Sequence, residues 1–297
     1  MRPSPNSECD ISRLSPTRTC APNGLRWCRT CPNAAYRMFG ISGACRSAWR
    51  CFSALSIVAN SRRELRSYVT GIKPGRVVCG TGNYTTALAR HGFKMTAVDP
   101  SREMLGHARH KSDDVRWVNS YSDDMPFSTG EFSGAVATLT IHHWPNRRAS
   151  FTEIRRILKT GTRFVIFSST PEQMNSYWIG HYFPRTMAST IWRMPTAETV
   201  SLALVAAGFT EPRCVPWFVP DDLMDLFWYA GKDRSDLYFD PTYRAGISGF
   251  REYCSDHELE DGLRRLRSDL DTGHWREVRR AAETLIGDYC FFVAEAV

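Results

Sequence analysis

The strongest constraint on this chain is the alternation, from Ser61 onward, of short apolar runs with amphipathic stretches. Apolar runs of strand length separated by helical stretches are typical of a parallel sheet covered by helices. The run over residues 134–141 is almost continuously apolar, as expected for a central strand buried on both faces. Seven strands are predicted in all, at residues 76–79, 93–98, 115–118, 134–141, 163–167, 214–219 and 289–294.

Helices are predicted between these strands, and each has a recognisable boundary. Ser101 is a suitable N-cap for a helix that runs to about Arg109, and glycines follow the ends of the others. Those others are residues 83–90 before Gly92, a helix with Phe151, Ile154 and Leu158 on one face before Gly161, and a helix from Thr196 to Gly208.

Between the last two strands lies an insertion, residues 220–286, which is predicted to form a helical cap. Its clearest signal is the leucine stripe at i, i+4, i+7 and i+11, formed by Leu259, Leu263, Leu266 and Leu270. A second helix is predicted over 223–230, with Asp221 or Asp222 as its N-cap. Residues 61–219 are then the core of the fold, and residues 287–297 return to it as the last strand.

The first sixty residues differ from the rest of the chain. They are rich in Arg, Ser, Pro and Cys, contain no Lys, and show no sustained helical or strand period. Cys28 and Cys31 could grip a zinc ion together with Cys20, Cys45 or Cys51, but no second pair follows at finger spacing. A transit peptide is a second alternative. The composition favours a disordered leader, or residues translated from an incorrect start or frame.

Charge and cysteine content restrict the possible partners and compartment. The formal net charge is +7, and residues 1–60, with eight Arg against Glu8 and Asp10, contribute +6 of it. The remaining body is close to neutral, so no nucleic-acid surface is predicted. No apolar stretch approaches the ~20 residues that a spanning helix needs, so no membrane segment is expected. Four scattered thiols, without a recognisable signal peptide, favour a reducing cytoplasm.

A glycine loop and an acidic residue together predict a nucleoside-bearing ligand. Gly80-Thr81-Gly82-Asn83 lies between a predicted strand and helix, where the backbone and free N–H groups can approach a ligand. Asp99 ends the second strand, seventeen residues after Gly82, where a carboxylate can accept both hydroxyls of a ribose. The alternative for Asp99 is a helix N-cap beside Pro100 and Ser101.

Five motifs, in this order and at this spacing, resemble those of the class I methyltransferases that depend on S-adenosylmethionine (SAM), of the type 11 kind. They are Gly80-Thr81-Gly82-Asn83-Tyr84-Thr85, Ala97-Val98-Asp99-Pro100-Ser101, Asp124-Met125-Pro126-Phe127, Ile141-His142-His143-Trp144 and Arg156-Ile157-Leu158-Lys159. The resemblance covers about residues 61–297, including a helical insertion before the last strand. It implies a Rossmann-like, doubly wound, mostly parallel seven-stranded sheet whose last strand is antiparallel.

The resemblance also assigns roles to individual residues. Gly80 and Gly82, with Thr81 and Asn83 between and after them, would hold the methionine part of SAM, and Asp99 the ribose hydroxyls. Tyr121 and Ser122 would lie near the adenine, with Met125 as an apolar wall. For Tyr121 and Ser122 an ordinary surface turn is the alternative. A nicotinamide-dependent oxidoreductase shares the loop and the acid, but the loop lacks a full G-x-G-x-x-G and the later motifs follow the methyltransferase pattern.

The first motif departs from the family pattern. Only Arg76-Val77-Val78 leads from Lys73-Pro74-Gly75 to Cys79-Gly80, so three or four residues are missing, including the acidic residue that in the family receives the amino group of SAM. Ser133 also replaces the Asp that commonly precedes the fourth strand. A strand cut this short must shrink or change register. An inactive methyltransferase fold that acts as a binding or scaffold module is therefore the alternative function.

Methyl transfer is an in-line displacement in which the protein chiefly supplies alignment, and it requires no metal. His142 and His143 are the candidate bases, because they end a central strand at its carboxyl edge. Adjacent strand residues point opposite ways, so at most one should face the site. The alternative is a histidine packed beneath the next helix. The aromatic residues Tyr177, Trp178, His181, Tyr182, Phe183, Trp228 and Tyr229 could roof a pocket for a small-molecule acceptor, although such residues are also typical of a core.

Overall fold

The structure is a computed structural model. It describes the backbone of residues 75–78, and residues 82–221, 223 and 225–297. The chain divides into two units, residues 1–45 and 46–297, and all described residues belong to the second. The predicted leader, the cysteines considered for zinc, and Cys79, Gly80 and Thr81 lie outside the described residues.

Seven strands form one sheet in the order β3-β2-β1-β4-β5-β7-β6. The first five pair in parallel, while β7 runs antiparallel to both β5 and β6. The mixed α/β class is therefore confirmed. The strands are β1 (Gly75–Val78), β2 (Met95–Asp99), β3 (Val115–Asn119), β4 (Phe132–Thr138), β5 (Leu158–Ser168), β6 (Arg213–Trp217) and β7 (Tyr289–Glu295).

The shortened first strand keeps its register. β1 contains four residues against seven in β4, and it pairs without interruption from Gly75 with Met95 to Val78 with Val98. Val78 is thus one position below Asp99, which ends β2. The missing residues shorten the strand, and the pairing is unbroken.

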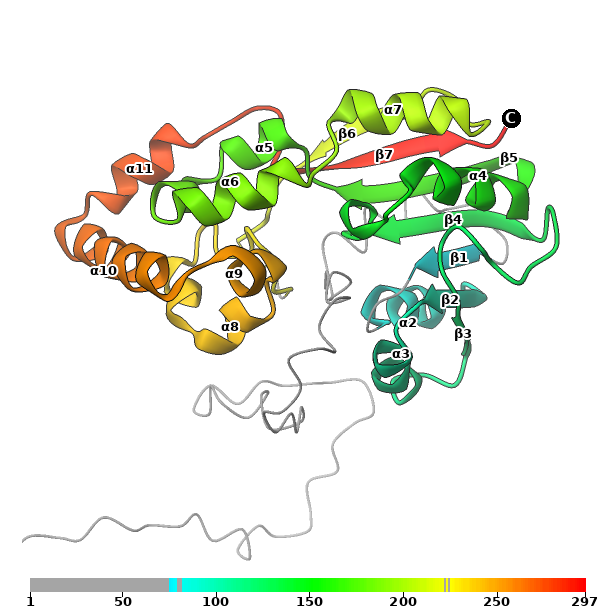
Figure 1. Cartoon of the computed structure of the whole chain (residues 1–297), viewed down its shortest axis with the longest axis horizontal. Helices are drawn as coiled ribbons and strands as arrows, with labels where there is room; N and C mark the ends of the chain where they lie inside the picture. The colour runs from blue at the N-terminus through cyan, green and yellow to red at the C-terminus, as the bar shows by residue number, and fades with distance from the viewer. Residues whose placement is uncertain (1–74, 79–81, 222, 224) are drawn as a thin grey trace, which may run out of the picture. The chain divides into compact units, whose positions relative to one another are not determined.

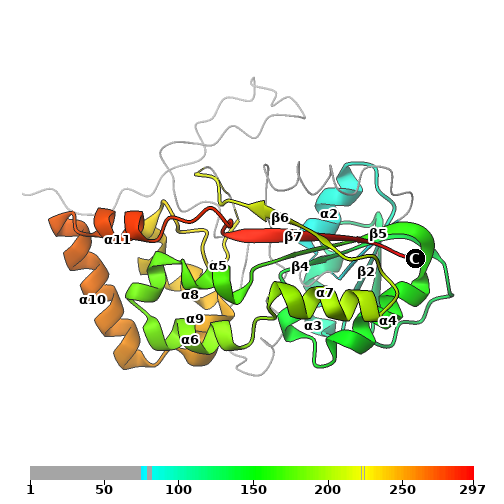
Figure 2. The ribbon, with the colours of Figure 1, turned by 90° about the horizontal axis from the view of Figure 1, so that it is seen from above.

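Two apolar layers lie on opposite faces of the sheet. In β5, Val165 and Phe167 pack in one cluster while Phe164 and Ile166 pack in the other, as the alternation of side chains along a strand requires. The first layer includes α2 (Asn83–Arg90), and the second includes α4 (Arg147–Ile157) and α7 (Ala197–Ala206). Figure 2 shows α2 on one side of the strands and α4 and α7 on the other.

A group of helices, named here the cap helices, gathers beyond the ends of β5 and β7 (Figure 1). They come from two separate parts of the chain, before α7 and after β6, and meet mainly where α6 packs on α9. Glu258 of α10 accepts hydrogen bonds from the first turn of α6. The cap helices are α5 (Pro171–Asn175), η3 (Trp178–His181), α6 (Pro184–Trp192), η4 (Ser235–Phe239), α8 (Pro241–Ala245), α9 (Ser248–Tyr253), α10 (Asp256–Thr272) and α11 (Trp275–Ala281).

Several predicted boundaries are confirmed because they depend on local caps. Ser101 Oγ accepts the Met104 N–H at the start of α3 (Arg102–Arg109), and Thr196 Oγ1 accepts the Thr199 N–H at the start of α7. The leucine stripe lies on α10, with Leu266 fully buried. A capped amphipathic helix carries its own signal in sequence.

Two predicted elements differ from the structure. The described residues of 223–230 form turns and irregular backbone, so the helix predicted there is wrong. Their apolar character has another cause, since Leu223, Phe227 and Trp228 are buried against the core. The helix predicted to stop at Gly161 ends at Ile157, because Leu158 enters the sheet directly and Gly161 takes a φ of 74° inside β5.

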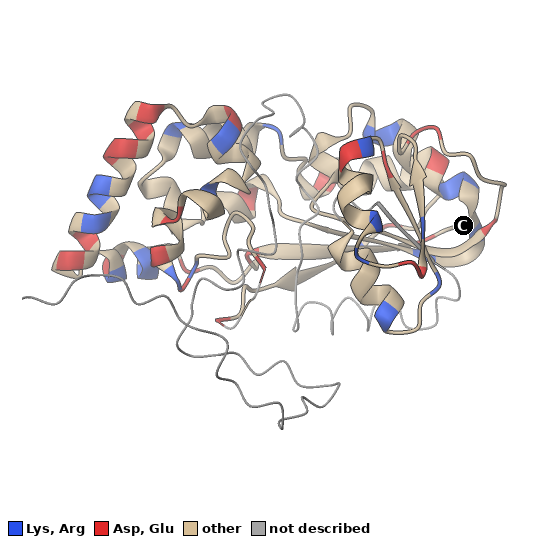
Figure 3. Ribbon diagram, turned by 90° about the horizontal axis from the view of Figure 1, so that it is seen from below, with Lys and Arg blue, Asp and Glu red and all other residues tan. Residues whose placement is uncertain are grey.

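Charged residues of both signs are interspersed along α10 (Figure 3). The strands of the sheet carry few charges in the same view. Within the described residues, every helix is too short or too polar to cross a lipid bilayer.

Candidate functional site

Gly82 lies at the start of α2 and must be glycine for two reasons. Its φ is 77°, a left-handed conformation that side chains disfavour, and a Cβ there would lie 2.4 Å from Cη2 of Trp117 in β3. Asn83 follows as the first residue of α2, and its side-chain oxygen accepts a hydrogen bond from Lys111. The backbone that leads into α2 is therefore tightly packed against β3 and the end of α3.

Asp99 is buried at the carboxyl end of β2, with 4% of its surface exposed. Its Oδ1 accepts the Ser101 N–H at 2.8 Å, while Ser101 itself caps α3. Asn119, at the end of β3, donates to the Asp99 carbonyl. The helix-cap role considered for Asp99 thus belongs to Ser101, and the turn into α3 holds the Asp99 carboxylate in place.

Tyr121 and Ser122 lie in the turn that follows β3. Tyr121 is 66% exposed and forms an isolated bridge with Asp124. The hydroxyl of Ser122 is 2.8 Å from that of buried Ser150 in α4. The two neighbours therefore differ, since one side chain reaches solvent and the other is tied to α4.

Met125 is buried, and α4 fixes the segment around it. Glu153 Oε1 accepts the Met125 N–H at 3.0 Å. Arg156 donates to the carbonyls of Met125 and Phe127, and it also binds Glu153. Two motifs that are separate in sequence, at 124–127 and 156–159, thus form one structural unit. The role of Glu153 was not predicted from the sequence. The only sequence feature that could have indicated it is its position three residues before Arg156.

His142 and His143 do not end a strand. β4 stops at Thr138, Leu139 takes a φ of 47°, and both histidines lie in a 3-10 helix, η2 (Ile141–His143). Their ring centroids are 4.0 Å apart. The alternation of side chains applies only within a strand, so it is not a valid reason here for expecting at most one histidine to face the site.

Both imidazoles are deeply placed. Among the described residues, His142 Nδ1 and His143 Nε2 are buried and have no hydrogen-bond partner. Burial lowers the pKa of His142 well below its ordinary value, and neighbouring His143 lowers it further. Burial also lowers the pKa of His143 to about 4, although Glu252 opposes the shift. Both rings are therefore neutral at pH 7.

Acidification is expected to destabilise the fold through His143. An unfolded histidine binds a proton below about pH 6.5, whereas the folded ring resists protonation down to about pH 4. The contribution is therefore complete above pH 6.5 and decreases as the pH falls. Between pH 7 and pH 4.5, His143 should lower the free energy of unfolding of the wild type by about 2.5 kcal/mol. The variant His143→Asn should lack this part of the loss. Denaturant unfolding at both pH values measures this, and equal pH dependence in the two proteins would contradict it.

A cavity of about 80 Å³, named here the inner cavity, lies beside His142 at the carboxyl edge of the sheet. Its wall combines residues that follow β4 and β5 with side chains of the cap helices. None of the described lining residues is charged. They are Leu139, His142, Ser169, Met174, Thr190, Met194, Leu226, Phe227, Trp228, Gly246, Ile247, Ser248 and Tyr289.

The aromatic residues predicted to roof a pocket divide into two groups. Trp228 lines the inner cavity. Tyr177, Trp178 and His181 instead line a wider groove between α6 and α11. Tyr182, Phe183 and Tyr229 are buried in the core, where Tyr229 stacks on Tyr177 at a centroid distance of 4.0 Å.

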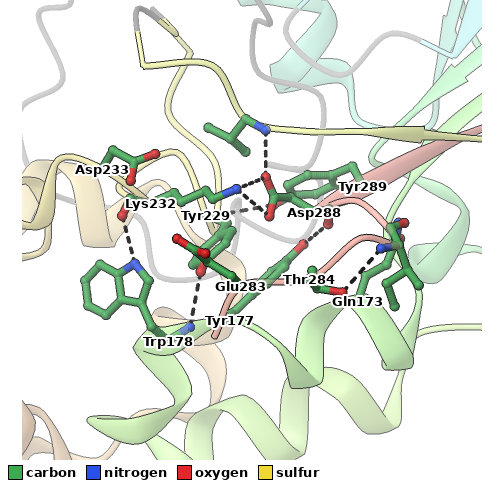
Figure 4. Close-up of polar contacts among 12 residues, drawn as sticks. Gln173, Tyr177, Trp178, Tyr229, Lys232, Asp233, Glu283, Thr284, Asp288 and Tyr289 are labelled. Atoms are coloured by element: carbon green, nitrogen blue, oxygen red, sulfur yellow. Dashed lines mark hydrogen bonds and ion pairs between the residues drawn. The ribbon is translucent and has the colours of Figure 1, made fainter. Parts of the chain in front are cut away.

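An ion pair joins the segment before η4 to the residue that precedes β7 (Figure 4). Lys232 Nζ lies 2.8 and 3.0 Å from the two carboxylate oxygens of Asp288, and the side chains are 13% and 2% exposed. Val219 N–H donates to the same carboxylate, and the Tyr177 hydroxyl donates to the Asp288 carbonyl. This network holds Tyr289, a wall of the inner cavity, against the segment around Tyr229.

Sequence reasoning missed Ser169, Tyr289 and Met174 as cavity residues. Ser169 follows β5 directly, so the rule that ligands lie beyond the carboxyl ends of parallel strands was a usable signal. Tyr289 and Met174 offered none. Across the part of the chain that the structure describes, no group of three or more His, Cys, Asp or Glu could hold a metal ion.

Residues 76–166 match a family model described as a methyltransferase domain. The chain is 27% identical over 150 residues to an uncharacterised methyltransferase of Synechocystis sp., covering 48% of this chain and 70% of that protein. It is 30% identical over 157 residues to a demethylmenaquinone methyltransferase of Clavibacter sepedonicus, covering 46% of this chain and 64% of that protein. This chain spans about half to seven-tenths of the length of the curated relatives that it matches.

The fold is also similar to a crystal structure from Anabaena variabilis, of a candidate methyltransferase from an antibiotic biosynthesis pathway. The TM-score is 0.68 and the identity 26%. The match covers 79% of this chain and 97% of that chain, so it includes the cap helices as well as the sheet.

Proposed function

We propose, from the premise that this chain belongs to the class I SAM-dependent methyltransferases, that it methylates a small, uncharged molecule in the inner cavity. The observation that carries the proposal is that His142 and Ser169 meet the aromatic residues Phe227, Trp228 and Tyr289 at the carboxyl edge of the sheet. Gly82 and Asp99 lie at the same edge. Open α/β sheets bind ligands there.

The residues present fit SAM as the cofactor. The carboxyl ends of β2 and β3 and the start of α2 supply a buried carboxylate, a polar turn and a glycine with positive φ. Asp99 would accept the ribose hydroxyls, and Gly80, Thr81, Gly82 and Asn83 would hold the methionine part. Tyr121, Ser122 and Met125 would lie around the adenine. When bound, SAM supplies an electrophilic methyl group on a sulfonium.

The residues that line the inner cavity indicate the charge and size of the acceptor. Its polar groups are neutral, and include His142, Ser169 and Thr190, while aromatic and aliphatic side chains form the rest. A charged acceptor would lose its hydration there without a described counter-ion in the wall. A volume of about 80 Å³ suits the reacting part of a small molecule.

His142 is the proposed base. Its Nδ1 is buried, has no hydrogen-bond partner among the described residues, and belongs to a ring that lines the cavity. Because burial lowers its pKa, the ring is neutral at pH 7 and can take a proton from an acceptor hydroxyl as the methyl group is transferred. His143 lies beside it and is not among the lining residues.

Titration with S-adenosylhomocysteine (SAH) tests the cofactor site. We expect micromolar binding by isothermal calorimetry, and an approximately 100-fold weaker affinity for Asp99→Ala, because about two hydrogen bonds to a charged group are lost. Asp123→Ala, a change of the same kind at an exposed position, should bind as the wild type does. No binding at millimolar SAH would favour the alternative, an inactive fold that acts as a scaffold.

A further inference from the structure

One buried acid near the proposed cofactor site has no role in the mechanism above. Asp225 is 1% exposed, although it lies in the irregular segment after β6. A carboxylate is removed from water only at a large cost unless charges or hydrogen bonds compensate it. The three buried carboxylates among the described residues are Asp99, Asp225 and Asp288.

Asp225 contacts the end of α2 that adjoins the glycine loop. The Tyr84 hydroxyl donates to Asp225 Oδ2 at 3.3 Å across 141 positions of sequence. Tyr84 is itself buried and stands two residues after Gly82, in the first turn of α2. The Leu226 N–H donates to Asp225 Oδ1 at 3.0 Å, which fixes the second oxygen. The carboxylate is thus positioned from both sides.

The residues that follow Asp225 reach the acceptor site. Leu226, Phe227 and Trp228 line the inner cavity. Asp225 therefore joins the wall of that cavity to the first turn of α2. If the nucleoside lies on Asp99 and the acceptor in the inner cavity, the sulfonium and its amino-acid portion lie between them, on the side of α2.

We infer that Asp225 binds the ammonium group of SAM, an inference that rests on the proposed function. A carboxylate and an ammonium form a short, charge-assisted hydrogen bond, which is about twice as strong as a neutral one. Tyr84 acts as a positioning residue by holding Oδ2. In this arrangement the carboxylate for the amino group comes from the segment after β6.

Two ligands separate this role from general damage to the site. SAH carries the ammonium, whereas 5′-methylthioadenosine shares the nucleoside and the sulfur but has no amino-acid portion. In calorimetric titrations of the full chain, Asp225→Asn should weaken SAH at least 30-fold and leave 5′-methylthioadenosine within twofold of wild type. Asp221→Asn, the same change at an exposed position four residues earlier, should alter neither.

Tyr84→Phe is the second variant, since it removes only the hydroxyl that holds Asp225. It should weaken SAH by about three- to tenfold, in the range of one neutral hydrogen bond, and leave 5′-methylthioadenosine unchanged. Unchanged SAH affinity in Asp225→Asn, or equal weakening of both ligands, would overturn the assignment alone. A wild-type chain that binds neither ligand would contradict the proposed function as well. Asp99→Ala should weaken both ligands, because both contain the nucleoside, and it therefore distinguishes the nucleoside end of the site from the ammonium end.

Discussion

Replacement of Lys232 by methionine is expected to lower the free energy of unfolding by about 3–5 kcal/mol, the effect of leaving a buried charge without its partner. Methionine keeps much of the length and apolar character of the lysine stem. The Asp288 side chain, 2% exposed, would lose the ammonium that lies 2.8 Å from Oδ2, and its carboxylate would keep only the Val219 N–H among the bonds described above. Denaturant unfolding at pH 7 measures the change.

Two controls identify the source of this effect. Adding Asp288→Asn to Lys232→Met removes the unpaired charge, and the double variant should recover part of the lost stability. Arg264→Met breaks the ion pair with Asp261 on α10, where the arginine side chain is 74% exposed. Because exposed pairs contribute about 0–1 kcal/mol, this variant should be nearly as stable as wild type. A Lys232→Met effect no larger than that of Arg264→Met would show that the buried pair does not stabilise the attachment of the cap helices.

Replacement of His142 by alanine is expected to lower kcat by about 10²- to 10⁴-fold, the usual contribution of a positioned base. SAH affinity should stay within about threefold, because His142 is assigned to the acceptor and not to the cofactor. The measurement is SAH release with the most rapidly methylated member of a panel of uncharged phenols. His143→Ala is the matched control, since His143 adjoins His142 but does not line the inner cavity.

The pH profile gives a second readout of the same assignment. Because burial lowers the pKa of His142 well below 6.5, the ring stays neutral through the neutral range. The kcat of the wild type should therefore be flat between pH 6 and 8 and fall only in more acid solution. If the kcat of His142→Ala equals that of the wild type at pH 7, His142 is not the base. The cavity would then contribute only by aligning the acceptor with the methyl group.

If Asp225 binds the ammonium group of SAM, the shortened first strand need not prevent cofactor binding. β1 is four residues long and in unbroken register. If the segment after β6 provides the carboxylate, the chain keeps an acid beside the first turn of α2 without one in β1. The cofactor site would then depend on the packing of the segment between β6 and η4, and Lys232→Met, which removes an ion pair of that segment, should weaken SAH binding.

The sequence by itself determined the elements whose signals are local. Residues 83–90 form α2 as predicted, Ser101 and Thr196 cap α3 and α7, and the leucine stripe lies on α10. Asp99 was placed correctly at the end of β2. Caps, periodicity and strand ends depend on neighbours within about four residues, so they can be read from one segment at a time.

Tertiary structure alone decided how distant segments meet. β4 ends at Thr138, but the apolar run in the sequence continues to Ile141, which is fully buried outside the strand. The apolar pattern therefore did not show that the chain leaves the strand before the histidines. Leu226, Phe227 and Trp228 line the inner cavity, and Leu223 is buried in the core, so these residues are apolar without forming a helix. The contacts of Asp225 with Tyr84 and of Lys232 with Asp288 join positions 141 and 56 residues apart. Pairings across such separations depend on the folded sheet edge and leave no periodic trace in the sequence.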